Sequence, residues 1–269
     1  MGLFDVHAHL TDRRLASQED DVLARAAEAG VTTIVVNGLN PKDNEAVAAL
    51  ASRSDIVRPA FGFYPVDTVL GPMQEAGVEY PRDDPEPPPT AEQGVAWVRD
   101  HVEEAFAVGE IGLDRYWVPE PFWEAQEKVF RELVALAMEA DKPIITHSRK
   151  AERRMFEVLQ EMGATRVDWH CFSSKVKLGR RIAEHGHWLS IPANAARVES
   201  FRRLLETMPR DKVLLETDCP YLSPVRGTTN EPANVQHTLS LAAELWGVSE
   251  EAALDQLEDN FEGLFGVRP

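Results

Sequence analysis

Short runs of β-branched and other apolar residues alternate with helix-forming segments along the whole chain. This alternation limits the possible folds more than any other feature. We expect eight strands, at 3–9, 32–37, 56–62, 106–113, 143–147, 166–172, 187–191 and 212–218. The segments between them carry apolar residues at three- and four-residue spacing, which is typical of helices that bury one face. Strands separated by helices form parallel sheets, because each helix returns the chain to the end of the sheet where the preceding strand began, and the next strand then runs in the same direction.

Eight strand–helix units in a chain of 269 residues fit a single closed (β/α)8 TIM barrel, an α/β fold. The alternative is an open doubly wound sheet, which normally has a glycine-rich phosphate-binding turn after its first strand. Residues 10–12, Leu-Thr-Asp, are not such a turn. We expect one domain over residues 1–269 that ends in a helix pair at 232–246 and 250–264. Residues 64–90, which are rich in proline and acids, predict a long loop after the third strand.

The composition indicates a globular protein from a reducing compartment. The chain is 43% hydrophobic, and its two cysteines, Cys171 and Cys219, have neither the spacing of a zinc finger nor that of a disulfide framework. The first residues lack the charged and apolar regions of a signal peptide, and no apolar run approaches the roughly 18 residues of a transmembrane helix. We therefore expect a cytoplasmic protein with no membrane contact and no evident obligate protein partner.

The charge balance argues against broad binding of nucleic acid. Lys and Arg total 28 and Asp and Glu total 45, which gives a net charge of −17. Proteins that bind nucleic acid broadly rely on basic surface. The charge is uneven, however, because residues 149–181 carry nine basic and four acidic residues. A cationic patch near this stretch could attract a phosphate group while the acidic body discourages long duplex contacts.

Ionisable residues stand at the C-terminal ends of five expected strands. His7 and His9 are two residues apart, so the alternation of a strand places both on one face. The other four are Glu110, His147, His170 and Asp218. Burying a lone carboxylate or imidazolium is costly unless the group is paired or metal-bound. Six donors at one rim exceed the needs of one tetrahedral ion and suit two ions, so the sequence predicts a dinuclear metal site at the C-terminal ends of the strands.

Five short motifs follow one another along the chain. They are His7-x-His9, the run Gly-Glu110-Ile-Gly-Leu-Asp114, His147 at a strand end, His170-Cys-Phe-Ser, and Glu216-Thr-Asp218-Cys-Pro-Tyr-Leu. Together they resemble the TatD family of metal-dependent deoxyribonucleases in the amidohydrolase superfamily, over about residues 4 to 264. The chain departs from the family pattern at Phe63-Tyr64-Pro65, where many members have His-Pro, and at Ser174, where glycine is usual.

The resemblance implies a role for each of these residues. One ion would be held by His7, His9 and Asp218, the other by His147 and His170, with Glu110 bridging them. It implies a deoxyribonuclease that cleaves phosphodiester bonds of DNA ends or short single strands with a hydroxide activated by two divalent metal ions. Exonuclease or 3′-end processing activity is expected, with Asp218 and Glu110 as catalytic residues. Four imidazoles favour Zn or Mn, whereas relatives are usually regarded as Mg-dependent.

Residues around the six predicted ligands complete the expected site. Arg149 and Arg226 are expected to contact phosphate, and Trp117 to stack on a base. Asp5 and Glu216 share strand faces with predicted ligands and are expected to support them from behind. If the sixth strand continues, alternation turns Cys171 away from the barrel interior.

Two other classes of protein remain open. One is a metal amidohydrolase that acts on a small C–N or ester substrate. Many such relatives bridge their ions with a carboxylated lysine, and the absence of lysine from 106–113 counts against this class. The other is a binding or scaffold protein with a vestigial barrel, which has no need to bury six ligand-type residues.

Overall fold

The computed structural model describes residues 2–82 and 86–269 and contains an eight-stranded parallel barrel. The strands are β1 (Leu3–Ala8), β2 (Val31–Asn37), β3 (Val57–Phe61), β4 (Ala107–Asp114), β5 (Ile144–Arg149), β6 (Val167–Trp169), β7 (Trp188–Ile191) and β8 (Val213–Leu215). Each strand pairs in parallel with the next in chain order. A parallel bridge between Ala8 and Cys219 closes the sheet on itself. The predicted (β/α)8 barrel is confirmed.

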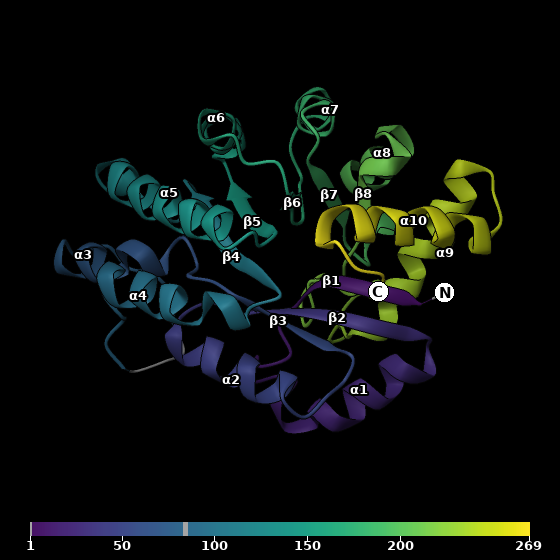
Figure 1. The fold of residues 1–269 in the computed structure, drawn as a ribbon, viewed down its shortest axis with the longest axis horizontal. Helices are drawn as coiled ribbons and strands as arrows, with labels where there is room; N and C mark the ends of the chain where they lie inside the picture. Colours follow the sequence, from purple (N-terminus) through teal and green to yellow (C-terminus); the bar gives the residue numbers. More distant parts are fainter. Residues whose placement is uncertain (1, 83–85) are drawn as a thin grey trace.

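Helices surround the strands (Figure 1). The α-helices are α1 (Glu19–Glu28), α2 (Pro41–Ala51), α3 (Leu70–Glu75), α4 (Ala91–His101), α5 (Trp123–Glu139), α6 (Glu152–Met162), α7 (Val176–Glu184), α8 (Glu199–Thr207), α9 (Gln236–Trp246) and α10 (Glu250–Phe265). Short 3-10 turns are η1 (Ala16–Gln18), η2 (Asp67–Val69), η3 (Val102–Glu104), η4 (Glu120–Phe122), η5 (Ala195–Arg197), η6 (Arg210–Lys212) and η7 (Pro232–Val235). The expected final helix pair is confirmed as η7 with α9, followed by α10. Within the described part of the chain, no helix has the length and apolar character needed to cross a membrane.

Local sequence signals set several helix boundaries. Asn40 caps α2 by accepting a hydrogen bond from a backbone N–H of the first turn, and Pro41 follows it. Thr90 and Gln93 form a reciprocal capping box at the start of α4. Gly163 and Gly247 end α6 and α9 with φ of 72° and 67°, a left-handed conformation that glycine adopts without steric cost.

Helix α10 crosses the N-terminal end of the barrel. The ring of Phe261 lies 4.9 Å from that of Phe4 in β1. The ring of Phe265 lies 4.9 Å from that of Phe106, which directly precedes β4 on the other side of the barrel. Both contacts are at the starts of strands. The helix therefore seals this end with apolar side chains and leaves the C-terminal ends of the strands free for a functional site.

Strands β6 and β8 are shorter than expected. The sequence predicted that each would run three residues further, but β6 ends at Trp169 and β8 at Leu215. Cys171 and Asp218 adopt left-handed backbone conformations, with φ of 46° and 56°. An extended strand cannot continue through such a residue, so the chain turns at the barrel rim.

The segment at 64–90 is not the continuous loop that its prolines predicted. It contains η2 and α3, whose Val69 and Met73 pack in a small apolar cluster that includes Val118. Pro72 is tolerated because it is the third residue of α3, where the backbone N–H has no helical partner. Residues 83–85 of the expected loop lie outside the described part of the chain.

We predict that Phe261→Ala lowers the free energy of unfolding by about 3–5 kcal/mol, because it removes a fully buried ring between α10 and the barrel. The measurement is urea unfolding followed by circular dichroism. Val267→Ala, at a 48% exposed residue just beyond α10, is the control and should change stability by less than about 0.5 kcal/mol. Equal stabilities for the two variants would contradict the sealing role of α10.

Candidate metal centre

The six predicted ligands lie together at the C-terminal end of the barrel. His7, Glu110 and His147 belong to strands, whereas His9, His170 and Asp218 stand one to three residues beyond β1, β6 and β8. Each of the six has a side-chain atom within 4.0 Å of another member of the group. The predicted convergence of residues from five strands is what the structure contains.

His7, His9 and Glu110 form the tightest part of the group. The two Nε2 atoms are 3.1 Å apart, and Oε2 of Glu110 lies 3.5 Å from that of His7 and 3.4 Å from that of His9. Ligand atoms about 2.1 Å from one ion are about 3.0–3.4 Å from one another. These three donors therefore fit a first-row divalent cation. His9 is oriented for this by its Nδ1, which lies 3.0 Å from the carbonyl oxygen of Asn37.

Glu110 contacts imidazoles through both of its carboxylate oxygens. Its Oε2 faces His7 and His9, and its Oε1 lies 2.9 Å from Nδ1 of His147. Burial alone raises the pKa of this carboxyl, but hydrogen bonds from His147 and His7 hold the pKa well below its ordinary value. Gly62 lets β4 approach β3 here, because a Cβ at that position would lie 2.2 Å from the backbone nitrogen of Glu110. The carboxylate is thus ionised and shared between two sides of the centre.

Asp114 is a site residue that the sequence analysis named only as the end of a motif and to which it gave no role. Its Oδ2 lies 3.0 Å from Nε2 of His147, so that the imidazole is held between two carboxylates. Burial lowers the pKa of His147, but hydrogen bonds to Asp114 and Glu110 outweigh burial and raise it to about 9. Strand alternation could have identified Asp114, which is four residues after Glu110 on the same face. Between them, Gly112 has a φ of 153°, and a Cβ there would lie 1.9 Å from the carbonyl oxygen of His147.

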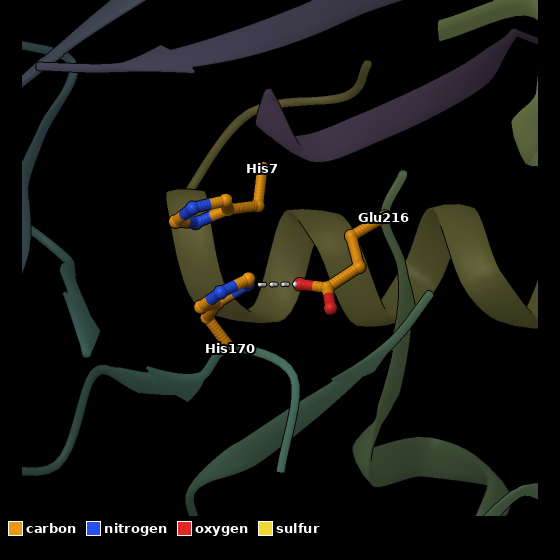
Figure 2. A group of neighbouring side chains, drawn as sticks. All are labelled: His7, His170 and Glu216. Carbon is orange, nitrogen blue, oxygen red and sulfur yellow. Dashed lines mark hydrogen bonds and ion pairs between the residues drawn. The ribbon is translucent and has the colours of Figure 1, made fainter. Parts of the chain in front are cut away.

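Glu216 contacts His170, whereas strand alternation had suggested that it would support Asp218. Figure 2 shows the His170 ring parallel to that of His7, with Glu216 approaching from the side. The two ring centroids are 3.5 Å apart, and Oε2 of Glu216 is 2.8 Å from Nδ1 of His170. This bond places the proton of a neutral His170 on Nδ1 and leaves the lone pair of Nε2 free to bind a metal ion. Burial lowers the pKa of both stacked imidazoles, which keeps them neutral.

A buried hydroxyl extends this support. Oγ of Ser190 lies 2.8 Å from Oδ2 of Asp168 and 2.7 Å from Oε2 of Glu216. One hydroxyl has one proton and can donate to only one carboxylate, so the other bond needs a protonated carboxyl group. Glu216 already accepts from His170, which places the proton on Asp168. Burial raises the pKa of both carboxyls to about 8, so a proton on this pair of carboxyls at neutral pH is consistent with their surroundings.

Asp5 contacts backbone rather than an imidazole. Its Oδ1 accepts hydrogen bonds from the N–H groups of His7, at 3.1 Å, and Thr217, at 2.9 Å. Burial raises the pKa of Asp5 to about 8. The residue joins β1 to the segment after β8 and so fixes the positions from which His7 and Asp218 extend. A supporting role for Asp5 stays a prediction, and its recorded contacts here are with backbone N–H groups and the hydroxyl of Thr217.

Asp218 is the most accessible carboxylate of the group. Its Oδ1 lies 3.6 Å from Nε2 of His9 and 3.9 Å from Nε2 of His170. Its side chain is 15% exposed, against 3% for Glu110. Burial raises the pKa of Asp218 to about 6. The carboxylate therefore lies near the imidazoles of His9 and His170 and is more exposed than that of Glu110.

Cys171 does not turn away as strand alternation predicted. Because β6 ends at Trp169 and Cys171 is left-handed, its sulfur lies with ligand atoms of His170 and Asp218, all within 4.8 Å of one another. Burial and the nearby carboxylates raise the pKa of the Cys171 thiol well above its ordinary value. Without bound cations the thiol is protonated and is a poor nucleophile.

The three expected substrate contacts have different surroundings. Arg149 is exposed at the end of β5, with its guanidinium 4.1 Å from the ring centroid of Tyr116. Trp117 is half-buried and packs edge-on against Tyr80 and Tyr116, at 5.4 and 5.0 Å between centroids. Arg226 is exposed in the segment between β8 and η7. Arg149 is thus two residues from a predicted ligand, whereas Arg226 makes no recorded ion pair with the six-residue group in the described chain.

Comparisons with known proteins agree with this architecture. A family model described as TatD related DNase matches residues 4–266. The metal-dependent hydrolase YabD of Bacillus subtilis is 30% identical, over 98% of this chain and 99% of its own length. The protein of Shigella flexneri named 3′-5′ ssDNA/RNA exonuclease TatD is 29% identical, over 98% and 99%. Among solved structures, the TatD homologue YJJV of Escherichia coli has a TM-score of 0.83 and 25% identity, with 98% of each chain covered.

The barrel, the group of His and acidic residues and these relatives together define a metal-dependent hydrolase. More specifically, the chain belongs to the TatD-related DNase family. The family resemblance drawn from five motifs is confirmed. Divalent metal use follows from the class of enzyme.

We predict that Asp114→Asn weakens metal binding about 10- to 100-fold without unfolding the protein. The asparagine oxygen can still accept from the N–H groups of Tyr116 and Trp117, as Asp114 does, whereas its amide cannot accept from Nε2 of His147. Isothermal titration of metal-free protein with Zn²⁺ or Mn²⁺ measures the effect. Asp141→Asn, at an exposed aspartate, is the control. Unchanged affinity in Asp114→Asn would show that the bond to His147 does not support metal binding.

Proposed function

We propose that this protein hydrolyses phosphodiester bonds at the ends of single-stranded DNA, using two divalent cations held by the six-residue group. The position of Glu110 carries this proposal. Its two oxygens face different imidazoles, with Oε2 near His7 and His9 and Oε1 near His147. A carboxylate placed in this way can bridge two ions, as two-metal hydrolases require.

In this proposal the six residues form two ligand sets that share Glu110. His7 and His9, with Asp218, would hold one ion, and His147 and His170 would hold the other. Asp218 lies between the sets, since its Oδ1 is within 4.0 Å of imidazole nitrogens from both. Four imidazoles favour Zn or Mn over Mg by ligand softness. Bound there, the cations supply positive charge that lowers the pKa of a water and stabilises charge on the phosphate oxygens.

The residues of the chain supply proton transfer and orientation. Asp218, the more exposed of the two carboxylates, accepts the proton of the attacking water at Oδ1. Glu110 would contribute negative charge to the bound cations, and its two oxygens keep the imidazoles of His7, His9 and His147 in place. Asp114 and Glu216 fix the rings of His147 and His170 so that their free nitrogens face the centre.

The local charge suits a phosphate substrate. Two divalent cations would offset the charges of the carboxylates at the centre, which include Asp114 and Glu216 as well as Glu110 and Asp218. Cationic side chains beside the centre would then make the mouth locally positive although the protein is acidic. Arg149 lies two residues beyond His147, and we propose that it and Arg226 contact phosphate. Trp117 is proposed to contact a base. The Shigella relative is named for single-stranded DNA and RNA, which supports single strands as the substrate class. The cytoplasmic location stays a prediction.

We expect Glu110→Ala to lose at least one equivalent of bound metal and to reduce hydrolysis more than about 100-fold, because the ions lose their shared ligand. Metal content is measured by mass spectrometry. Activity is measured on bis(p-nitrophenyl) phosphate and on 5′-labelled decathymidylate, with product ends identified. Glu139→Ala, at an exposed glutamate of α5, is the matched control and should retain metal and activity.

A panel of lactones and amides tests the second candidate, a metal amidohydrolase. Turnover of that panel by a protein that leaves both phosphodiesters intact would overturn the nuclease proposal. Full phosphodiesterase activity in Glu110→Ala would overturn the two-metal arrangement instead.

A further inference from the structure

Two exposed tyrosines stand on opposite sides of the barrel mouth. Tyr116 follows β4 and Tyr221 follows β8, and both residues are 48% exposed. Each ring has a guanidinium 4.1 Å from its centroid. The guanidinium near Tyr116 is that of Arg149 at the end of β5, and the one near Tyr221 is that of Arg14 after β1. In a closed sheet with strands in chain order, β4 and β5 lie opposite β8 and β1. The metal centre therefore lies between two similar tyrosine–arginine pairs.

The two pairs differ in charge. The guanidinium of Arg14 makes hydrogen bonds to both carboxylate oxygens of Asp12, each at 2.8 Å, which neutralises it. Across the described residues, neither Arg149 nor Lys150 has a side-chain ion pair with a carboxylate. Nζ of Lys150 lies 4.8 Å from the same Tyr116 ring. Only the Tyr116 side thus combines an exposed ring with uncompensated positive charge.

The Tyr116 side is also tied to the metal centre. His147 and Arg149 are two residues apart in β5, so alternation places both on the same face of the strand. The N–H of Tyr116 donates to Oδ1 of Asp114, whose Oδ2 holds His147. The edge-on contact with Trp117 further fixes the Tyr116 ring. One carboxylate therefore positions both the imidazole of the centre and the loop that presents the ring.

We propose that Tyr116, Arg149 and Lys150 form a subsite for the nucleotide next to the scissile phosphate of a single strand. Arg149 and Lys150 hold a backbone phosphate, and the Tyr116 ring supports an unpaired base. This inference rests on the proposed function. A single strand offers an aromatic face and a phosphate within one nucleotide, and base–aromatic stacking with backbone cations is the general mode of single-strand binding. A duplex keeps its base faces inside the stack and cannot use the ring.

The test measures binding of a fluorescein-labelled phosphorothioate decathymidylate, which resists hydrolysis, to the metal-loaded enzyme by fluorescence anisotropy. Tyr116→Ala should raise Kd about tenfold or more, whereas Tyr116→Phe should stay within about twofold of wild type. Tyr221→Ala, the matched control on the neutralised side, should change Kd less than about threefold. Arg149→Ala and Lys150→Ala should each lower the slope of log affinity against log salt by about 0.7. Thermal melting and metal content verify that every variant is folded and loaded.

Equal effects of Tyr116→Ala and Tyr221→Ala would overturn the subsite. The subsite would also be overturned if Tyr116→Ala weakened binding of the duplex, formed by annealing the same strand to decaadenylate, as much as it weakened binding of the single strand. If the wild type cleaves decathymidylate and Tyr116→Ala binds it normally, the subsite is wrong and the nuclease function stands. If the wild type cleaves bis(p-nitrophenyl) phosphate but neither binds nor cleaves decathymidylate, the nucleic-acid function fails and the subsite with it.

Discussion

Glu110 is buried at the mouth of the barrel with its two oxygens facing different imidazoles, those of His7 and His9 on one side and of His147 on the other. An ionised carboxylate in such a place is costly unless cations or N–H donors surround it. The imidazoles satisfy this requirement in the metal-free chain, and divalent ions satisfy it more completely. The need to compensate one buried charge therefore explains why histidines from several strands must meet at this point.

The imidazoles can surround Glu110 only because a second layer of polar groups holds them. Asp114 fixes His147, and Glu216 fixes His170. The same groups also secure the fold, since Glu216 accepts from the N–H of Cys171 and Asp5 joins β1 to the segment after β8. Barrel closure and ligand orientation thus depend on hydrogen bonds of neighbouring buried groups in one polar layer. Removing one of these groups is expected to affect both, which is why conservative replacements separate the two effects better than alanine.

The hydrophobic period and the spacing of the motifs were sufficient to predict the barrel. They also predicted that the six candidate ligands lie together, because parallel strands all end at one rim. They could not place the ends of β6 and β8, since nothing in the residue types of Cys171 and Asp218 signals their left-handed backbone. The sulfur of Cys171 consequently lies near the centre instead of behind it. Asp114 was accessible to the same reasoning, being on the Glu110 face of β4. The exposed ring of Tyr116 could not be predicted in this way, because residue type alone does not show whether a loop tyrosine is buried or exposed beside Trp117.

Net charge is a poor guide to this site, and the structure explains why. At least nine of the 21 arginines form ion pairs with nearby acids. Arg53, Arg131, Arg154 and Arg268 each contact two or three carboxylates. Such surface pairs contribute little to stability, but they remove positive charge from the outer surface. Unpaired cations beside the metal centre then produce a local field that an overall charge of −17 conceals. With cations bound as proposed, an acidic body with a locally positive mouth would attract a short anionic strand end-on and repel a long duplex laid across the surface.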